Sequence, residues 1–217
     1  MKRFIVVGLG LFGAKVARAL AAAGHEVIAV DRDEALVDEI GPYVTHAAVV
    51  DAREAEALEA VGARDCDAGV ISIGTDIGAS VLIALALRDL KVREIHAKVT
   101  SREHARVLEK LGVTGTVFPE EEAAVRLAER LTTPGVLSAV PLAEGFSLRE
   151  IAVPDAFLGK TLRQLKLPQT RRIQVVAVKD VLSGALNPLP DPDAVLKDSD
   201  ILVVVGADDE LDRLAKG

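Results

Sequence analysis

Short apolar runs alternate with helical patterns through the first 132 residues, and this alternation constrains the fold more than any other feature. Each run has the length of a β-strand and consists largely of Val, Ile and Ala, as expected of strands buried on both faces. Regular alternation of strands and helices favours a parallel sheet covered by helices. The predicted strands are 4–7, 27–30, 46–50, 68–72, 94–99 and 115–118, and the predicted helices are 11–23, 33–40, 53–61, 75–90, 102–111 and 121–132.

The pattern changes at Thr132-Thr133-Pro134-Gly135, a cluster of residues that break helices and strands. Beyond it the pattern predicts strands at 146–153, 172–180 and 200–206 and helices at 159–167 and 207–217. The prolines within residues 187–200 exclude a central strand there. We therefore predict a Rossmann-type, doubly wound parallel α/β sheet over residues 1–134 and a small α+β C-terminal domain over residues 135–217.

The segment Gly8-Leu9-Gly10-Leu11-Phe12-Gly13 matches G-x-G-x-x-G between a predicted strand and a predicted helix. In that setting Gly8 permits the tight turn, Gly10 lets the backbone approach a pyrophosphate, and Gly13 lets the helix pack closely on the strand. The N-terminus of the helix offers free N–H groups and a partial positive charge to phosphates. The segment therefore predicts a nucleotide-binding loop.

Asp31 ends the second predicted strand, where a carboxylate can accept hydrogen bonds from ribose hydroxyls. The same carboxylate would repel a 2′-phosphate, which disfavours NADP, although the neighbouring Arg32 weakens that exclusion.

Three further strand ends lead to the same crevice. The stretch Val50-Asp51-Ala52-Arg53 lies at the end of the third strand, where an adenine edge would lie, and Asp51 is equally placed to cap the next helix. The small residues of Ser72-Ile73-Gly74-Thr75-Asp76, after the fourth strand, leave room for a ribose or a phosphate, or form an ordinary turn. Lys98 closes the fifth strand, where it either reaches a phosphate or lies in solvent.

Composition excludes several classes of protein. The net charge of −7, without a Lys/Arg-rich run, argues against a nucleic-acid binder. The single cysteine, Cys66, is expected to be a buried apolar residue in a reducing compartment. The longest apolar run, residues 79–87, is about half of what a membrane span needs. With no signal-peptide pattern at the N-terminus, we expect a soluble, cytoplasmic protein.

The sequence shows no clear catalyst. The four histidines are His25, His46, His96 and His104, and no His, Cys or carboxylate spacing is typical of a metal site or a nucleophilic triad. The acidic run Glu120–Glu122 is expected to open a helix. A nucleotide site without visible chemistry favours a ligand sensor over an enzyme.

Four segments carry a family resemblance: FIVVGLGLFGAKVARALAAAGHEVIAVDRDEALVDEI, YVTHAAVVDAREAEALEAVGARDCDAGVISIG, IHAKVTSREHARVLEKLGVTGTVFPEEEAA and the tail FSLREIAVPDAFLGKTLRQLKLPQTRRIQVVAVKD with LKDSDILVVVGADDELDRL. In these segments the chain resembles the RCK family (regulator of K+ conductance, also called KTN), the cytosolic regulatory subunits of Ktr/Trk-type potassium uptake systems. The resemblance implies dimers that assemble into an octameric ring under a membrane-embedded K+ translocating subunit, at the inner face of the membrane.

The resemblance also implies a ligand, ATP, ADP or NAD(H), in the glycine crevice. Carried over by position, it assigns the phosphates to the glycine loop, including Phe12, and to Lys98, and it assigns the ribose and the adenine to the strand ends named above. Glu120 matches a glutamate that helps to hold a divalent cation at the dimer interface in some relatives, and the C-terminal domain of some relatives binds a cyclic dinucleotide in a dimer groove. Many relatives have Arg where this chain has Leu11, which puts ATP-specific gating in doubt.

We therefore predict a non-enzymatic, nucleotide-sensing regulatory subunit of a potassium transporter. Two alternatives stay open: a small NAD-dependent oxidoreductase with Lys98 or His96 as its acid/base group, and a stand-alone nucleotide or redox sensor.

Overall fold

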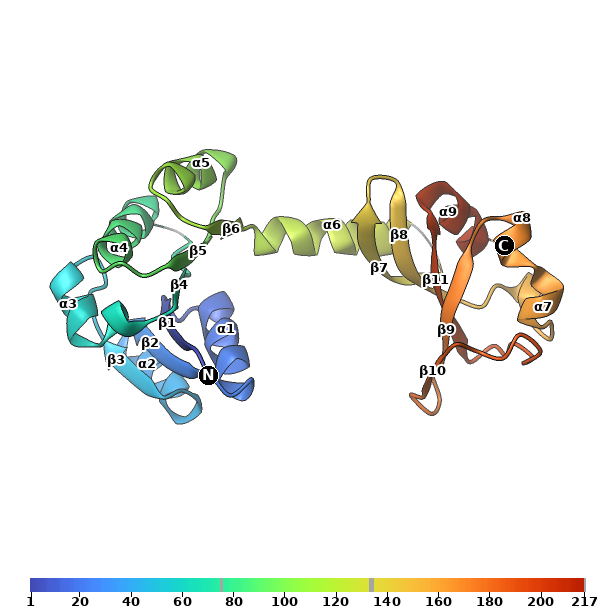
Figure 1. Ribbon diagram of the computed structural model, residues 1–217, viewed down its shortest axis with the longest axis horizontal. Helices are drawn as coiled ribbons and strands as arrows, with labels where there is room; N and C mark the ends of the chain where they lie inside the picture. Colours follow the sequence, from blue (N-terminus) through green and yellow to red (C-terminus); the bar gives the residue numbers. More distant parts are fainter. Residues whose placement is uncertain (75, 133–134, 217) are drawn as a thin grey trace. The chain divides into compact units, whose positions relative to one another are not determined.

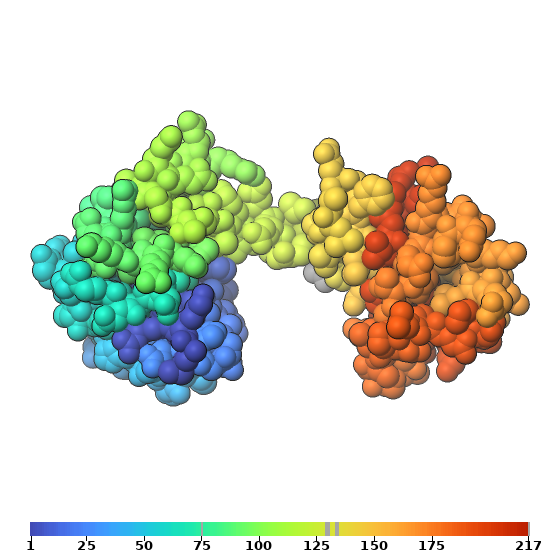
Figure 2. All heavy atoms as spheres, viewed as in Figure 1, coloured from blue at the N-terminus to red at the C-terminus, as the bar shows by residue number. Residues whose placement is uncertain are grey.

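A computed structural model describes residues 1–74, 76–132 and 135–216. The chain divides into two compact units, residues 1–120 and 121–217, and side chains fill the space between the ribbons within each unit (Figure 2). The division falls inside one helix, α6 (Pro119–Thr132). The predicted boundary at Pro134 lies outside the described residues and stays a prediction.

The first unit contains a six-stranded parallel sheet with the order β3-β2-β1-β4-β5-β6. Its strands are β1 (Arg3–Val7), β2 (Glu26–Asp31), β3 (His46–Val49), β4 (Ala68–Ile71), β5 (Glu94–Lys98) and β6 (Gly115–Val117). All of them run in one direction, so their carboxyl ends share one edge. The order reverses between β1 and β4, which is the switch point where such sheets bind ligands. The predicted doubly wound sheet is confirmed.

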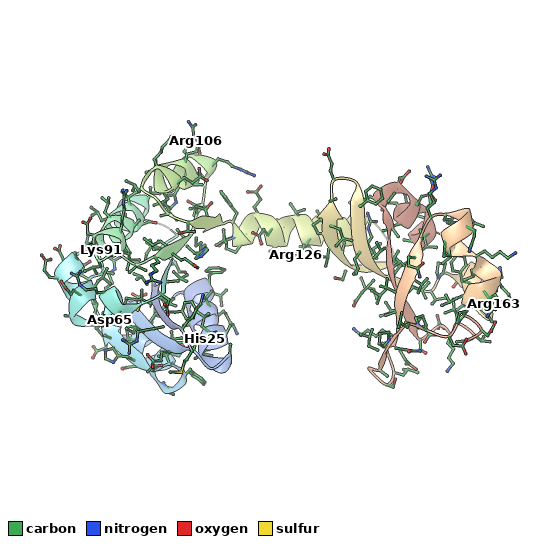
Figure 3. The ribbon with its side chains drawn as sticks, viewed as in Figure 1. His25, Asp65, Lys91, Arg106, Arg126 and Arg163 are labelled. Atoms are coloured by element: carbon green, nitrogen blue, oxygen red, sulfur yellow. The ribbon has the colours of Figure 1, made fainter. Side chains whose placement is uncertain are left out.

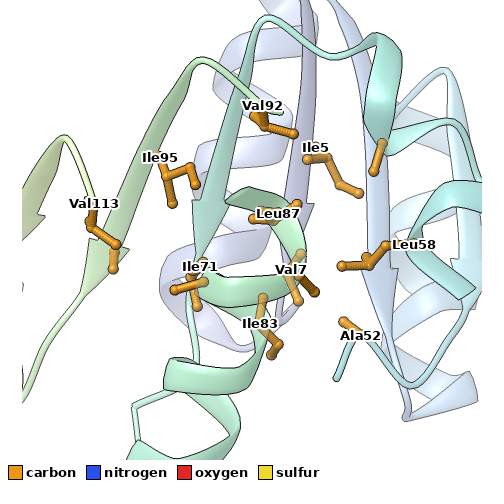
Figure 4. Packing of buried hydrophobic residues seen from close by; sticks show 14 of the residues in the cluster. Ile5, Val7, Ala52, Leu58, Ile71, Ile83, Leu87, Val92, Ile95 and Val113 are labelled. Atoms are coloured by element: carbon orange, nitrogen blue, oxygen red, sulfur yellow. The ribbon is translucent and has the colours of Figure 1, made fainter. Parts of the chain in front are cut away.

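Helices cover both faces of this sheet (Figure 1). On one face, α1 (Leu11–Ala22) and α2 (Glu34–Ile40) pack on side chains such as Val6 and Val27. On the other face lie α3 (Ala55–Ala60), α4 (Ile77–Asp89) and α5 (Arg102–Lys110), over Ile5, Val7 and their neighbours (Figure 4). Alternate residues of one strand thus serve opposite faces, because side chains alternate along a strand. Two 3₁₀ turns, Gly41–Tyr43 and Ala63–Asp65, complete the unit.

Several helices begin at other residues than predicted. The side chain of Asp33 caps α2 by accepting the N–H of Ala35, so this helix starts one residue late. The side chain of Asp76 caps α4 in the same way, through the N–H of Ala79; the predicted start of α4, Thr75, lies outside the described residues. By contrast, α6 begins early, at Pro119, because proline fits the first position of a helix. Its first turn holds the acidic run, as expected.

The second unit contains an antiparallel sheet with the order β10-β9-β11-β8-β7. Its strands are β7 (Val136–Ala143), β8 (Phe146–Ala152), β9 (Gln174–Asp180), β10 (Leu186–Pro188) and β11 (Asp200–Ala207), and its helices are α7 (Leu162–Leu165), α8 (Leu167–Thr170) and α9 (Asp208–Lys216), with a 3₁₀ turn at Asp155–Phe157. The small α+β character is confirmed. The prediction missed β7, β10 and α8. Both missed strands lie at sheet edges, where Pro141 and Pro188 are tolerated.

Arg149 ties β8 to α9 in this unit. Its guanidinium donates to the carboxylates of Asp208 and Asp212 and to the hydroxyl of Ser147. The Arg149 side chain is only 12% exposed, so these bonds lie in a partly dry environment. Beneath them Leu202, Leu211 and Leu214 are fully buried. The packing of α9 therefore combines an apolar face with one largely buried cation, the guanidinium of Arg149.

Candidate functional site

A hollow of about 360 Å³ opens at the carboxyl ends of β1, β2, β4 and β5. This is within the range of small-molecule sites. Each predicted nucleotide-binding residue except Gly13 lines it. The residues that the sequence analysis named are Gly8, Gly10, Leu11, Phe12, Asp31, Arg32, Asp51, Ala52, Ser72, Ile73, Gly74 and Lys98. Their grouping follows from the parallel sheet; their roles toward a ligand stay predictions.

The glycine loop has the geometry that its motif predicts. Gly8 has a φ of +91°, and a Cβ on it would lie 2.7 Å from the carbonyl oxygen of Ser72. A Cβ on Gly13 would lie 1.9 Å from the carbonyl oxygen of Gly8, so the helix can approach the strand only with glycine here. A Cβ on Gly10 would meet nothing within 4 Å. Gly10 therefore keeps open the space through which a ligand reaches the loop.

The N-terminus of α1 is left uncapped. Gly10 is the N-cap residue and has no side chain to accept a hydrogen bond, and the first turn carries no acidic residue. The first N–H groups of a helix have no partner within it. Because Leu11 and Phe12 line the hollow, these N–H groups provide a binding point for an anion.

Asp31 supports the loop as well as facing the hollow. One carboxylate oxygen accepts the N–H of Leu9 at 2.6 Å, and the other accepts the N–H of Asp33 at 3.0 Å. A carboxylate can accept further bonds with its remaining lone pairs. Asp31 is therefore still able to bind ribose hydroxyls while it holds the loop in shape.

Asp51 is engaged by Arg53, two residues along the chain. The Nε of Arg53 donates to Oδ1 at 2.8 Å and its Nη2 donates to Oδ2, which makes a two-pronged pair. This hydrogen bonding lowers the pKa of Asp51 to about 2. The alternative role for Asp51, as the cap of the next helix, is wrong: residues 51–54 form a turn, and α3 starts at Ala55 after Glu54. The N–H of Glu54 closes that turn by donating to the carbonyl oxygen of Asp51, while the Asp51 carboxylate accepts from the backbone and the side chain of Arg53.

Lys98 ends β5 with its ammonium toward the hollow, and it is paired with a residue from another element. Its Nζ donates to Oε1 of Glu120 at 2.6 Å. The Lys98 side chain is 17% exposed, whereas that of Glu120 is 70% exposed. The hydrogen bond from Lys98 lowers the pKa of Glu120. A Cβ on Gly74 would lie 3.5 Å from this ammonium, so Gly74 leaves it uncovered on the side of the hollow.

The divalent cation that Glu120 was predicted to hold at a dimer interface stays a prediction. The carboxylate of Glu120 already neutralises an ammonium group. Among the described residues, no three His, Cys, Asp or Glu side chains gather where a metal ion could bind. A hard divalent cation prefers several oxygen ligands, so a site at Glu120 would take further ligands from a second copy of the chain.

The histidines lie away from the hollow. His96 packs over Gly115 on the neighbouring strand, where a Cβ would come within 2.8 Å of its Nδ1. His104 is buried on α5 with both ring nitrogens unpaired, and the ring of His25 contacts the ring of Phe4 at a tilt of 59°. None of them is among the residues that line the hollow. Cys66 is buried, as expected, and burial raises its pKa to about 11.

The sequence analysis placed Val50, Arg53 and Asp76 at strand ends that lead to the hollow but gave them no role toward a ligand. The pairing of Arg53 with Asp51 was missed, and the spacing Asp-x-Arg directly after a strand could have indicated it. Asp76 caps α4 from the rim. The residues that the sequence analysis missed are apolar and give no signal beyond their place in strands and helices: Val7, Ala79 and Ile83.

The second unit has a larger hollow, of about 530 Å³. Its walls come from α7, α8, β9 and the proline-rich connection, including Pro190 and Pro192. Arg163, which projects from α7 (Figure 3), is paired with Asp193 at 2.6 Å. Two basic residues, Arg163 and Lys166, line this hollow.

Comparison with known proteins assigns both units. The model of the TrkA-N domain matches residues 4–119, and that of the TrkA-C domain matches residues 148–216. Ktr system potassium uptake protein C of Bacillus subtilis is 35% identical over 99% of this chain and 96% of its own length. Ktr system potassium uptake protein A of Vibrio alginolyticus is 33% identical over 97% of this chain and 94% of its own length.

Solved structures share the fold. The GsuK channel superposes with a TM-score of 0.67 at 18% identity over 97% of this chain, and this chain spans 38% of that channel chain. The GsuK channel bound to NAD gives a TM-score of 0.53 at 20% identity, over 100% of this chain and 38% of its own. The described residues contain no helix long and apolar enough to cross a membrane. The TrkA-N model matches more than half of the chain, and the Ktr relatives match nearly all of it. The chain therefore belongs to the RCK family of potassium uptake proteins.

Proposed function

We propose that the chain is a nucleotide-sensing regulatory subunit that gates a membrane-embedded potassium transporter. The observation that supports this most is the hollow itself. It joins an uncapped helix N-terminus, a glycine loop and a carboxylate at the end of β2. That combination suits a ligand with a phosphate, a ribose and a base.

The ligand is an adenine nucleotide or NAD(H). The phosphates would lie on the glycine loop and the N–H groups of Leu11 and Phe12, and the ribose against Asp31. The base would then lie toward the Asp51–Arg53 pair and Ala52. The GsuK channel, which shares the fold, has been solved with NAD bound. Leu11 is 85% exposed and uncharged, so it adds no positive charge for a terminal phosphate.

Gating would follow from differential affinity. A ligand that binds one conformation of the assembly more tightly moves the population toward it by no more than that difference in free energy. The relatives are potassium uptake proteins by name, which supports a K+ translocating membrane protein as the partner. We propose a ring of dimers, octameric in its full form, held at the inner face of the membrane by that partner.

The test is thermal unfolding of the purified chain with AMP, ADP, ATP, NAD, NADH and NADPH, combined with mass detection of any ligand that co-purifies. A ligand that binds only the folded state stabilises it by about 2.7 kcal/mol at a hundredfold excess over Kd. Stabilisation by adenine nucleotides or NAD(H) is expected, with NADPH weaker. If no nucleotide raises the Tm, the proposed sensing function is wrong.

A variant and an assay sharpen this test. Leu11→Arg should strengthen ATP binding more than AMP binding, because the added guanidinium would meet the outer phosphates. Hydride transfer from NADH across a broad set of carbonyl substrates would instead support the oxidoreductase alternative. Co-purification of a membrane protein with K+ transport activity would support the proposed partner.

A further inference from the structure

Arg53 lies at the end of the hollow that the proposed function assigns to the base. It follows β3 and lines the hollow together with Asp51 and Ala52. In the same turn Val50 donates its N–H to the carbonyl oxygen of Asp31 at 2.8 Å, so the turn lies directly beside the residue proposed to bind the ribose. A base attached to that ribose is therefore a neighbour of the Arg53 side chain.

The guanidinium of Arg53 is fixed by its own turn before any ligand binds. Nε donates to Oδ1 of Asp51 at 2.8 Å, Nη2 donates to Oδ2, and the backbone N–H of Arg53 donates to Oδ1 at 3.2 Å. Two parallel N–H groups on one carboxylate hold the two planar groups in a fixed orientation. One edge of the guanidinium is thus occupied, while the side chain is still 43% exposed. Its flat faces remain available to an aromatic ring.

The start of α4 borders the same end of the hollow. The pKa of Arg53 is raised by its hydrogen bond to Asp51 and, among smaller causes, by the charge of Asp76, the N-cap residue of α4. One and two turns further along the helix, Ala79 and Ile83 line the hollow with apolar side chains. The base end of the hollow therefore combines a planar cation with an apolar wall, which suits a flat aromatic ring.

Charge separates this end of the hollow from the phosphate end. Asp51 neutralises Arg53, and the carboxylate of Asp76 adds a further negative charge nearby, so phosphates gain little here. The N-terminus of α1 is instead uncapped and carries the positive end of the helix dipole. A guanidinium is weakly hydrated and stacks on aromatic faces, so covering it with a base costs little.

We propose that Arg53 binds the base of the nucleotide by stacking on it, so that the site reads the face of a purine and not the pattern of groups along its edge. The proposal rests on the proposed nucleotide site and adds to it the manner in which the base is recognised. Every base has a π face, and a purine covers more of the guanidinium than a pyrimidine does. The site should therefore prefer purines and tolerate a 6-oxo group in place of the 6-amino group of adenine.

The first experiment compares different bases on the same phosphate chain. The full chain is titrated calorimetrically with ADP, with inosine diphosphate, in which oxygen replaces the 6-amino group, and with CDP, a pyrimidine. ADP and inosine diphosphate should bind within about threefold of each other, and CDP should bind about tenfold more weakly, because it loses stacking area. A site that reads the edge of the base would reject inosine diphosphate about a hundredfold or more.

Two variants separate the plane of the guanidinium from its charge. Arg53→Lys keeps a cation that can pair with Asp51 but has no flat face, and Arg53→Met removes both the charge and the plane. Each variant should lower the affinity for AMP and for ADP about tenfold, the size of one base-stacking contact, because the two ligands share the base. A role through charge would instead leave Arg53→Lys close to wild type.

The matched control is Arg64→Lys. Arg64 pairs with Glu59 at 2.6 Å, is 50% exposed and is not among the residues that line the hollow, so this variant should bind ligands like wild type. The NMR signal of the Nε–H proton of Arg53, assigned by its loss in Arg53→Lys, gives a second readout. A base stacked on the guanidinium shields this proton and moves its signal upfield, whereas a base hydrogen-bonded in the same plane moves it downfield. Thermal unfolding of each variant without ligand checks that the fold is retained.

Equal losses for Arg53→Lys and Arg53→Met, with inosine diphosphate bound like ADP and an upfield shift, support stacking. Rejection of inosine diphosphate, an Arg53→Lys protein that binds like wild type, an equal loss in Arg64→Lys or a downfield shift overturns it. Wild-type protein that binds ADP with an affinity that neither Arg53 substitution changes refutes only this inference. Wild-type protein that binds no nucleotide refutes the proposed function and this inference with it.

Discussion

The two units gather their polar groups in different ways because one sheet is parallel and the other antiparallel. In the first unit all strands end at the same edge, and loops at Gly8, Asp31, Asp51 and Lys98 meet around one hollow although they are far apart in sequence. In the second unit neighbouring strands run in opposite directions, so strand ends are shared between two edges. Its hollow is lined by short helices and prolines instead.

This difference between the two sheets shows how strand direction creates a binding site. A parallel sheet brings helix N-termini and strand ends together as a consequence of its topology. An antiparallel sheet has no such edge, and its charged residues serve packing between elements, as Arg149 does between β8 and α9. Binding in the first unit should therefore depend on backbone geometry, and stability of the second unit on individual side-chain contacts.

The largest effect should come from Gly13→Ala. The new Cβ would lie 1.9 Å from the carbonyl oxygen of Gly8, so α1 must move off β1 at a cost of about 3 kcal/mol or more. Nucleotide stabilisation should be lost with it. Chemical denaturation with and without ADP measures both effects.

The matched control for that variant is Gly10→Ala. The space around Gly10 is open and its φ is −60°, so the fold should be kept while ligand binding weakens. If the Gly13→Ala protein had the free energy of unfolding and the ADP affinity of wild type, this would contradict the close approach of the loop and the helix.

The glycine loop and its surroundings could be predicted well from the sequence because the backbone conformation at each of these positions determines which residue type is found there. Gly8 needs a positive φ, and Asp31 ends a strand of recognisable pattern. What the sequence could not give are contacts between distant side chains. The pairing of Lys98 with Glu120 joins residues 22 positions apart, and strand β7 was missed because Leu137, Val140 and Leu142 on it are exposed and carry no core pattern.

The next largest effect should be Arg149→Met in the second unit. The change leaves Asp208 and Asp212 close together without their shared cation and should cost about 2 kcal/mol. The measurement is denaturant unfolding, together with the ADP-dependent shift of Tm. Stability should fall while the ligand-dependent shift stays as in wild type; a lost shift would break the division of roles between the two units.

A smaller effect should appear in the pH dependence of the free energy of unfolding. It should be confined to the first unit, which contains all four histidines. Burial lowers the pKa of His104, so its unfolded form binds a proton more readily than its folded form. Stability should therefore fall as pH drops below the unfolded value of about 6.5. Replacing His104 with Leu should flatten this part of the pH profile. An unchanged profile from pH 7 to 5 would show that another group is responsible.

The smallest effect should come from the two arginine–aspartate pairs at the rims of the hollows. Arg53→Ala should raise the pKa of Asp51 from about 2 toward its ordinary value of 3.8. Arg163→Ala should raise the pKa of Asp193, which Arg163 holds below its usual range. NMR titration of the two carboxyl groups measures both. Equal shifts would mean that such pairs behave alike in both units, whether the partners are near or distant in sequence.

The bond from the N–H of Leu9 to Asp31 gives the loop its shape before any ligand arrives. The ligand-free protein has then already met the entropic cost of ordering this loop, which favours fast association without a slow closing step. The amide proton of Leu9 should exchange slowly with solvent even in the absence of nucleotide. An Asp31→Ala protein would lose two things together, the acceptor for the ribose and the preformed loop, so its weaker binding would include a slower, induced fit.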